Sequence, residues 1–116
     1  MGIDVLIVDD LTFIKMVLRD LLEKAGFRVI GEASDGEEAL SLFQAKRPDV
    51  VLLDITMPKM DGLTALKNML KIDPQAKVIM CSALGQQQLI VQAIQLGAKD
   101  FIVKPFRPER VVSSIK

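Results

Sequence analysis

Two hydrophobic patterns alternate along this chain, and their alternation constrains its fold more than any other feature. Short apolar runs recur at about 4–8, 28–33, 50–54, 77–81 and 100–103, and stretches with helical spacing lie near 12–25, 36–46, 62–72, 86–96 and 108–116. Short apolar runs without polar alternation are typical of strands buried on both faces of a parallel sheet. Five strand–helix units predict an α/β fold, a doubly wound five-stranded parallel sheet with right-handed crossovers and helices on both faces.

Residues that begin and end helices support these boundaries. Gly26 follows the first helical stretch and Gly97 follows the fourth, where glycine is the common C-terminal cap. Asp35 precedes the second stretch with Glu38 three residues later, a pair that resembles a capping box. Pro108 suits the first turn of the fifth helix.

Composition predicts one domain over residues 1–116. Hydrophobic residues make up 50% of the chain, which is enough to bury a core without disulfides. Lys and Arg total 15, as do Asp and Glu, so there is no net field to attract nucleic acid or an anionic membrane. No apolar run approaches the roughly 20 residues of a membrane span, and no leader sequence is recognisable. We therefore expect a cytoplasmic protein that neither inserts into membranes nor binds nucleic acid directly. The single Cys81 lies in an apolar run and is interpreted as an inert buried thiol.

Charged residues directly follow three of the predicted strands. Asp9 and Asp10 follow the first apolar run, Asp54 ends the third, and Lys104 follows the fifth. In an open parallel sheet, ligands bind outside the carboxyl ends of the strands, where residues distant in sequence meet. Three carboxylates and one ammonium sum to about −2, which suits a hard divalent cation with oxygen ligands. Mutual repulsion should raise the pKa of at least one of these carboxyls.

Asp54 begins the most specific stretch of the sequence, which runs to Gly62. A strand-end carboxylate can accept a phosphoryl group if it is held in line with the donor and its charge is neutralised by a metal. Pro58 and Gly62 predict a loop of fixed shape before the next helix. The same stretch alone also fits an ordinary turn with a solvated aspartate. The charged residues at the other strand ends favour the phosphoryl site.

Several motifs resemble one known family over essentially the whole chain. They are Val8-Asp9-Asp10, Asp54-x-x-Met57-Pro58-x-Met60-Asp61-Gly62, Ser82-Ala83 and Lys104-Pro105. In this order they resemble the receiver domain of two-component response regulators. The segments 81–87 and 97–106 resemble more narrowly the chemotaxis regulators of the CheY type. The resemblance implies a receiver domain over 1–116 with a flavodoxin-like sheet of strand order 2-1-3-4-5.

The resemblance also implies a metal-assisted phosphoryl site. Asp54 would take a phosphoryl group from the phosphohistidine of a sensor histidine kinase. Asp10 and Asp54 would bind Mg²⁺ directly, together with the backbone carbonyl of Thr56, and Asp9 would act largely through a bound water. Few carboxylates and several waters are the usual ligands of Mg²⁺. Asp61 is interpreted as a turn residue, not as a fourth acid.

Three further residues would read the phosphoryl group. Lys104 would pair with Asp54 before transfer and with the phosphoryl oxygens afterwards. Ser82 would donate its hydroxyl to a phosphoryl oxygen, and Phe101 would rotate inward as the aromatic switch residue. Each has a plainer interpretation: Ser82 as a turn cap, Lys104 as a surface ammonium, and Phe101 as a core aromatic.

The output implied by the resemblance is a protein surface formed by the fourth helix, fifth strand and fifth helix. Its partner would be an acidic or amphipathic peptide of the flagellar motor switch protein, facing the cations Lys99, Arg107 and Arg110. The protein would then be a signalling switch that catalyses only its own phosphorylation and dephosphorylation. A phosphorelay intermediate and a receiver cut from a DNA-binding response regulator remain open alternatives.

Two unrelated classes fit less well. Phosphatases of the haloacid dehalogenase type place a second Asp two residues after the nucleophile, where this chain has Thr56. A flavodoxin needs a phosphate loop rich in Ser, Thr and Gly after the first strand, where this chain has the carboxylates Asp9 and Asp10.

Overall fold

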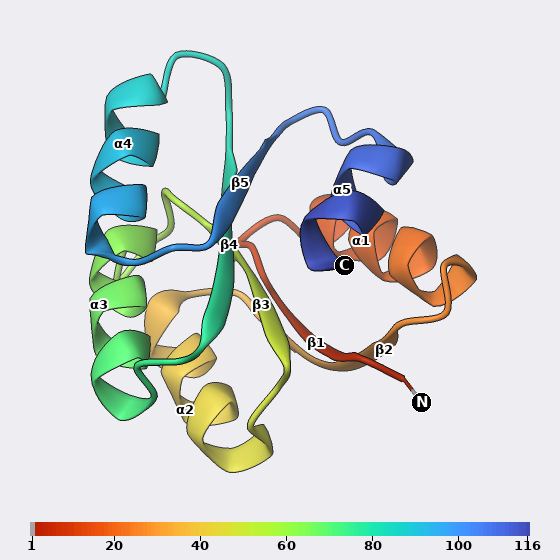
Figure 1. Cartoon of the computed structure of the whole chain (residues 1–116), viewed down its shortest axis with the longest axis horizontal. Coiled ribbons are helices and arrows are strands. Elements are labelled where there is room, and N and C mark those ends of the chain that lie inside the picture. Colours follow the sequence, from red (N-terminus) through yellow and green to blue (C-terminus); the bar gives the residue numbers. More distant parts are fainter. Residues whose placement is uncertain (1) are drawn as a thin grey trace.

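Strands and helices alternate along the whole computed structural model, which describes residues 2–116 (Figure 1). The strands are β1 (Asp4–Val8), β2 (Arg28–Ala33), β3 (Val50–Asp54), β4 (Lys77–Ser82) and β5 (Asp100–Val103). The helices are α1 (Thr12–Lys24), α2 (Gly36–Lys46), α3 (Gly62–Ile72), α4 (Gln87–Leu96) and α5 (Pro108–Ile115). Each boundary lies within a single residue of the range predicted from the sequence.

All strand pairs are parallel, and the sheet has the order β2-β1-β3-β4-β5. Helices α1 and α5 cover one face of the sheet, and α2, α3 and α4 cover the other (Figure 1). The predicted doubly wound α/β fold is therefore confirmed. The order reverses at β1, which has β2 on one side and β3 on the other.

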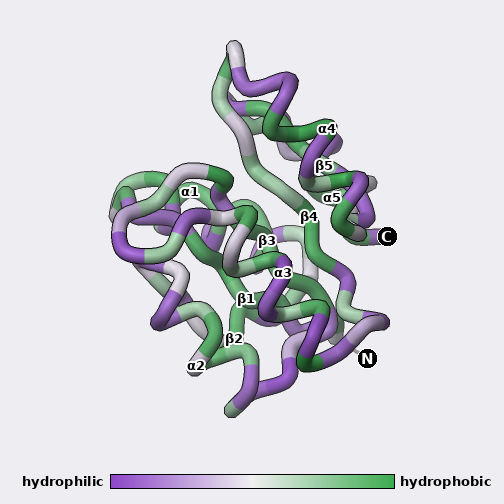
Figure 2. The backbone as a smooth tube through the Cα atoms, turned by 90° about the vertical axis from the view of Figure 1, so that its left-hand side faces the viewer, coloured by the Kyte–Doolittle hydropathy of each residue, from purple (hydrophilic) through white to green (hydrophobic). Residues whose placement is uncertain are grey.

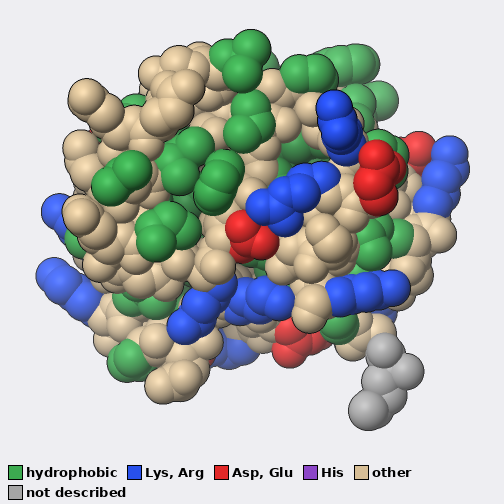
Figure 3. Space-filling view, turned by 45° about the horizontal axis from the view of Figure 1, so that its top comes forward, with side chains coloured by type: hydrophobic (Ala, Val, Ile, Leu, Met, Phe, Trp, Pro, Cys, Tyr) green, Lys and Arg blue, Asp and Glu red, His purple; other side chains and the backbone are tan. Residues whose placement is uncertain are grey.

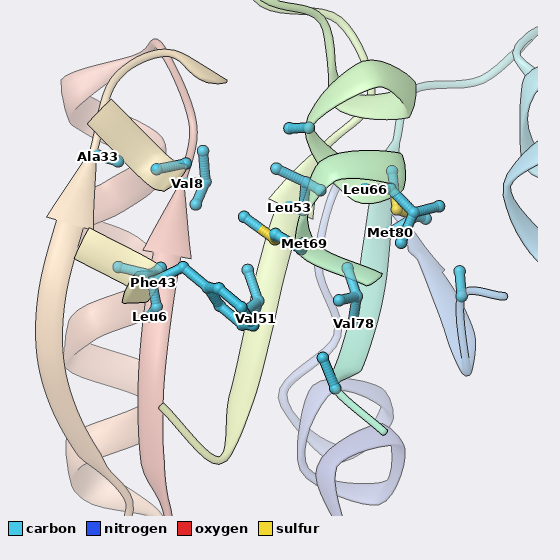
Figure 4. Close-up of a cluster of buried hydrophobic side chains, with 14 of the residues drawn as sticks. Leu6, Val8, Ala33, Phe43, Val51, Leu53, Leu66, Met69, Val78 and Met80 are labelled. Carbon is cyan, nitrogen blue, oxygen red and sulfur yellow. The ribbon is translucent and has the colours of Figure 1, made fainter. Parts of the chain in front are cut away.

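The sheet has a hydrophobic core on each face, because successive strand residues point to opposite sides. The core beneath α2, α3 and α4 includes Leu6, Val8, Phe43, Leu53, Leu66, Met69 and Met80 (Figure 4). The core beneath α1 and α5 includes Ile7, Leu18, Leu22, Leu52, Ile79, Cys81, Val111 and Ile115. In Figure 2 the central strands are mostly hydrophobic, whereas the helices alternate between hydrophobic and hydrophilic segments. Cys81 is buried as predicted, and this burial raises the pKa of its thiol.

Burial on both faces was predicted for most strands, and it holds for the central strands β1, β3 and β4. The exceptions are β2 and β5, which are largely only partly buried. These two strands lie at the sheet edges, so each has a neighbouring strand on one side only. Among the helices of residues 2–116, none combines the length and the apolarity needed to cross a membrane.

The helix termini follow the sequence signals with one correction. Gly97 caps α4 at φ 123°, a conformation that favours glycine. Asp35 caps α2 and accepts a hydrogen bond from the backbone N–H of Glu38 at 2.9 Å. The carboxylate of Glu38 accepts from the N–H of Ser34 at 2.8 Å, one residue earlier than a capping box requires. Only half of the predicted capping box therefore forms.

Candidate functional site

The charged residues that follow the strands meet at the carboxyl edge of the sheet. Asp9 and Asp10 follow β1, and Asp54 is the last residue of β3, the strand beside β1. One carboxylate oxygen from each of the three residues lies within 4.8 Å of the others. Asp9 and Asp54 are buried, and Asp10 is exposed. Figure 3 tilts this edge toward the viewer and shows acidic and basic side chains beside one another, with exposed hydrophobic patches around them.

Lys104 reaches this cluster from the loop that follows β5. Its Nζ lies 2.9 Å from Oδ2 of Asp9 and 3.4 Å from Oδ1 of Asp54. Its backbone N–H donates to the carbonyl of Ser82 at 2.8 Å, which ties the start of this loop to β4. Lys104 is thus a paired and partly buried ammonium, not a solvated one. Its expected pairing with Asp54 is present, but the closer contact is with Asp9.

The three aspartates differ in how many of their oxygens are already used. Oδ1 of Asp9 accepts from the backbone N–H of Leu11 at 2.9 Å, and Oδ2 accepts from Lys104. Asp54 accepts a hydrogen bond, from Lys104, at Oδ1 alone. Within residues 2–116 the carboxylate of Asp10 accepts none. The oxygens free to bind a cation therefore belong mainly to Asp10 and Asp54.

Burial and crowding perturb the titration of the site. Burial, reinforced by the negative charge of Asp9, raises the pKa of Asp54 to about 6, although Lys104 opposes the shift. Burial tends to lower the pKa of Lys104, but its hydrogen bond to Asp9 and the charge of Asp54 outweigh burial and raise that pKa. The cluster thus holds one permanent ammonium beside a carboxyl that ionises reluctantly. A bound cation would favour the ionised form of Asp54.

The β3–α3 loop, residues 55–61, is held tightly against the end of β3. The N–H of Gly62 donates to the carbonyl of Ile55 at 2.7 Å. A Cβ at Gly62 would lie 2.2 Å from the carbonyl oxygen of Asp54, so only glycine fits this close approach. Asp61 caps α3 by accepting from the N–H of Thr64 at 2.8 Å, which matches its interpretation as a turn residue. Thr56 is exposed in this loop, two residues after Asp54.

Ser82 ends β4 immediately beside the acidic cluster. Its neighbour Cys81 is the register partner of Asp54 across β3 and β4. Ser82 is fully buried, and its Oγ has no hydrogen-bond partner among residues 2–116. The alternative that this hydroxyl caps a turn is therefore not what the structure contains. A buried hydroxyl without a protein partner is costly to maintain, and a functional role is one explanation for such a group.

Phe101 lies on β5 with its side chain partly in solvent, at 36% relative exposure. The guanidinium of Arg110 lies 6.0 Å from the centre of its ring. Phe101 is therefore not a core aromatic in this arrangement. It borders a predominantly apolar groove of about 480 Å³ between α4 and β5, lined by Gln87, Ile90, Val91, Ile94, Gln95, Phe101 and Val103.

One residue beside the site was not predicted by sequence reasoning. The side-chain amide of Gln86 accepts from the N–H of Ala83 at 2.7 Å and donates to the hydroxyl of Thr56 at 3.0 Å. It thereby connects the loops that follow β3 and β4. Gln86 lies outside the periodic positions of α4, so hydrophobic spacing gives no signal for this contact.

Comparison with known proteins agrees with this geometry. The chain matches the response regulator receiver domain over residues 5–116. The chemotaxis protein CheY of Thermotoga maritima is 55% identical over 115 residues, covering 99% of this chain and 96% of that protein. CheY of Bacillus subtilis is 54% identical over 111 residues, covering 96% of this chain and 92% of that protein.

A solved structure gives the same result in three dimensions. A chain of the CheX–CheY–BeF3–Mg²⁺ complex from Borrelia burgdorferi resembles this chain with a TM-score of 0.93 and 45% identity, covering 97% of this chain and 86% of that chain. The resemblance inferred from the motifs is thus confirmed. The chain belongs to the receiver domain family of two-component response regulators, and its similar relatives include chemotaxis proteins of the CheY type.

Proposed function

We propose that this chain is a phospho-accepting signalling switch of the chemotaxis type. The observation that carries the proposal is the convergence of Asp9, Asp10 and Asp54 within 4.8 Å, with Lys104 in contact with two of them. In this proposal Asp54 accepts a phosphoryl group from the phosphohistidine of a sensor histidine kinase. The added charge then changes the equilibrium between two conformations of a protein-binding surface.

The residues present fit Mg²⁺, the cation that receiver domains bind at an acidic pocket. Asp10 and Asp54 have oxygens free to bind it directly, and Thr56 would add its backbone carbonyl. Both oxygens of Asp9 already accept hydrogen bonds, so a contact through water suits Asp9 better than a direct one. When bound, Mg²⁺ would supply positive charge that offsets the carboxylates and the transferring phosphoryl group.

Each residue of the site has a defined task in the transfer. A carboxylate oxygen of Asp54 forms the new bond to phosphorus as the bond from phosphorus to the histidine nitrogen breaks, and the electron pair leaves with the imidazole. Lys104, held between Asp54 and Asp9, is placed to follow the negative charge onto the phosphoryl oxygens. Ser82 supplies a hydroxyl that has no other partner among residues 2–116.

The output surface would be the face formed by α4, β5 and α5. Movement of Ser82 toward the phosphoryl group would open space into which Phe101, now partly exposed, could rotate. Arg110 is engaged with Asp100 at 2.8 Å and with the carbonyl of Phe101 at 2.5 Å. Lys99 and Arg107 are therefore the cations more available to an acidic or amphipathic peptide of the flagellar motor switch.

Chemical labelling tests the phosphoacceptor. Acetyl phosphate should label the protein in a Mg²⁺-dependent way, and hydroxylamine should remove the label, as it does from an acyl phosphate. Asp54→Asn should not be labelled at that position. Asp61→Asn is the matched control, because asparagine also caps helices well and Asp61 ends the loop that follows Asp54. Full labelling of Asp54→Asn, or loss of labelling in Asp61→Asn alone, would contradict the assignment.

A binding titration tests the output. A motor-switch peptide should bind more tightly in the presence of Mg²⁺ and beryllofluoride, by the ratio of its affinities for the two conformations and no more. Equal binding in both conditions, or none in either, would favour a phosphorelay intermediate or a receiver from a DNA-binding regulator.

A further inference from the structure

A single glutamine side chain connects the two loops that flank the candidate phosphoacceptor. Oε1 of Gln86 accepts from the N–H of Ala83 at 2.7 Å, and Nε2 donates to Oγ1 of Thr56 at 3.0 Å. A backbone N–H can only donate, so the orientation of the amide is fixed by Ala83: its oxygen faces Ala83 and its NH₂ group faces Thr56. Gln86 precedes the first turn of α4, and its own helix receives no side-chain cap from it.

These two contacts lie close in sequence to the residues that would hold a phosphoryl group. Ala83 directly follows Ser82, and Thr56 is two residues after Asp54. The ends of β3 and β4 are neighbours in the sheet, with Asp54 paired in register with Cys81. The connected loops therefore follow the two neighbouring strands at whose ends a phosphoryl group on Asp54 would lie.

In the arrangement that Gln86 stabilises, the Ser82 hydroxyl contacts no polar group of residues 2–116. In the proposed function Ser82 moves toward a phosphoryl group on Asp54, and the end of β4 moves with it. The peptide bond between Ser82 and Ala83 must shift with it, and that peptide carries the N–H that Gln86 now accepts. Engagement of Ser82 and retention of the Gln86 contact are therefore in competition.

We propose that Gln86 is a positioning residue that keeps Ser82 disengaged by holding the β4–α4 loop, residues 83–86, against Thr56. This inference rests on the proposed phosphoryl site at Asp54 and adds a restraint on its response. Release of Gln86 from Ala83 accompanies activation, so loss of the side chain favours the activated arrangement. Loss of two neutral hydrogen bonds to exposed loop residues should shift that equilibrium by about fivefold.

Gln86→Ala tests the proposal, and Gln88→Ala is its matched control. Gln88 is exposed on the same helix, and its side chain makes no hydrogen bond with residues 2–116. Thr56→Val is a second variant, which removes the hydroxyl while keeping the backbone carbonyl. Three quantities are measured by amide NMR: hydrogen exchange of the Ala83 N–H without ligand, the affinity for Mg²⁺ alone, and the concentration of beryllofluoride that half-saturates the Mg²⁺ form.

In Gln86→Ala the Ala83 amide should exchange faster, and beryllofluoride should half-saturate at about one-fifth of the wild-type concentration. Its Mg²⁺ affinity should stay unchanged, as should all three values in Gln88→Ala. Thr56→Val should show a smaller effect on beryllofluoride, and the double variant should not exceed Gln86→Ala alone, because both changes release one restraint.

The outcomes separate this inference from the proposed function. If wild type takes no beryllofluoride, the proposed phosphoryl site fails and the inference fails with it. If wild type takes it and Gln86→Ala behaves identically or requires more, the site stands and the restraint is overturned. Unchanged exchange at Ala83 in Gln86→Ala would also overturn it, whatever the ligand affinity.

Discussion

The loops after β3 and β4 flank the same site, yet they are held in place by different means. The loop after β3 is held by backbone contacts. The N–H of Gly62 donates to the carbonyl of Ile55, and the backbone at Gly62 packs so closely that a Cβ there would collide with the carbonyl of Asp54. The loop after β4 depends on the side chain of Gln86, and a Cβ at its Gly85 would meet no atom within 4 Å. The loop that follows the phosphoacceptor is therefore closely packed, whereas the loop after β4 rests on one side chain and has open space at Gly85. This difference suits a switch, because the nucleophile needs fixed alignment and the residues that respond to it need room to change conformation.

Alanine substitutions at the two glycines should give the largest difference between the loops. Gly62→Ala places a methyl group 2.2 Å from a backbone oxygen, so we expect it to lower the free energy of unfolding by about 3 kcal/mol or more. Gly85→Ala faces open space and carries only the strain of its φ of 91°, about 1 kcal/mol. Urea denaturation measures both values. Similar losses for the two variants would mean that the loops are equally constrained.

Electrostatic strain at the end of β3 should give the next largest effect. The pKa of Asp54 is raised from 3.8 to about 6, so the ionised carboxylate is less favourable in the folded protein than in the unfolded chain. Stability without Mg²⁺ should therefore fall as pH rises from about 4 to about 6 and stay lower above that range. Asp54→Asn removes this penalty and should be more stable than wild type at pH 7.5, by on the order of 2 kcal/mol.

Denaturation of both proteins at pH 4.5 and pH 7.5 checks this expectation. The lowered pKa values of Asp35 and Asp100 affect wild type and variant alike, so the difference between the two proteins isolates Asp54. A wild-type advantage at pH 7.5 would show that the carboxylate is well accommodated and that no strain is stored there.

Lys104 contacts the ends of β3 and β4, since its backbone N–H donates to the carbonyl of Ser82 and its ammonium contacts Asp54. Lys104→Ala should keep the fold and retain some labelling by acetyl phosphate, because the ammonium takes no part in the bond change. The gain in partner affinity on phosphorylation should fall from about tenfold to about none. Without Lys104 the phosphoryl group would no longer favour one of the two conformations over the other. Peptide binding by the phosphorylated variant measures this. If the phosphorylated variant bound the peptide as tightly as phosphorylated wild type, Lys104 would act only as a local counter-ion.

The charged residues at the strand ends could be predicted from sequence more fully than the contacts of the loop after β4. Asp54 and Lys104 follow apolar runs, and the carboxyl ends of parallel strands necessarily gather at one edge. Gln86 could not be predicted, because its contacts depend on side-chain conformations in a loop without periodicity. The closer contact of Lys104 with Asp9 could not be predicted either. Its Nζ is only 0.5 Å nearer to Asp9 than to Asp54, and sequence spacing does not determine so small a difference in distance. The role of Ser82 was implied only by resemblance to the family. That its hydroxyl has no hydrogen-bond partner among residues 2–116 depends on side-chain packing, which the sequence does not give.

A substitution at Lys59 should have the smallest effect, and it tests whether backbone contacts alone hold the β3–α3 loop in position. It has a φ of 66°, a conformation that costs a non-glycine residue strain, and its Nζ lies 3.6 Å from the carboxylate of Asp35. Lys59→Gly relieves the backbone strain but increases the freedom of the unfolded chain. We expect a net gain in unfolding free energy of about 0.5 kcal/mol or less, since the lost ion pair is exposed and screened. Because Gly62 and Asp61 still fix the loop, the Mg²⁺ affinity measured by amide NMR should match that of wild type. A clear loss of Mg²⁺ affinity in Lys59→Gly would show that the loop is positioned by its contact with Asp35 and not by the backbone at Gly62.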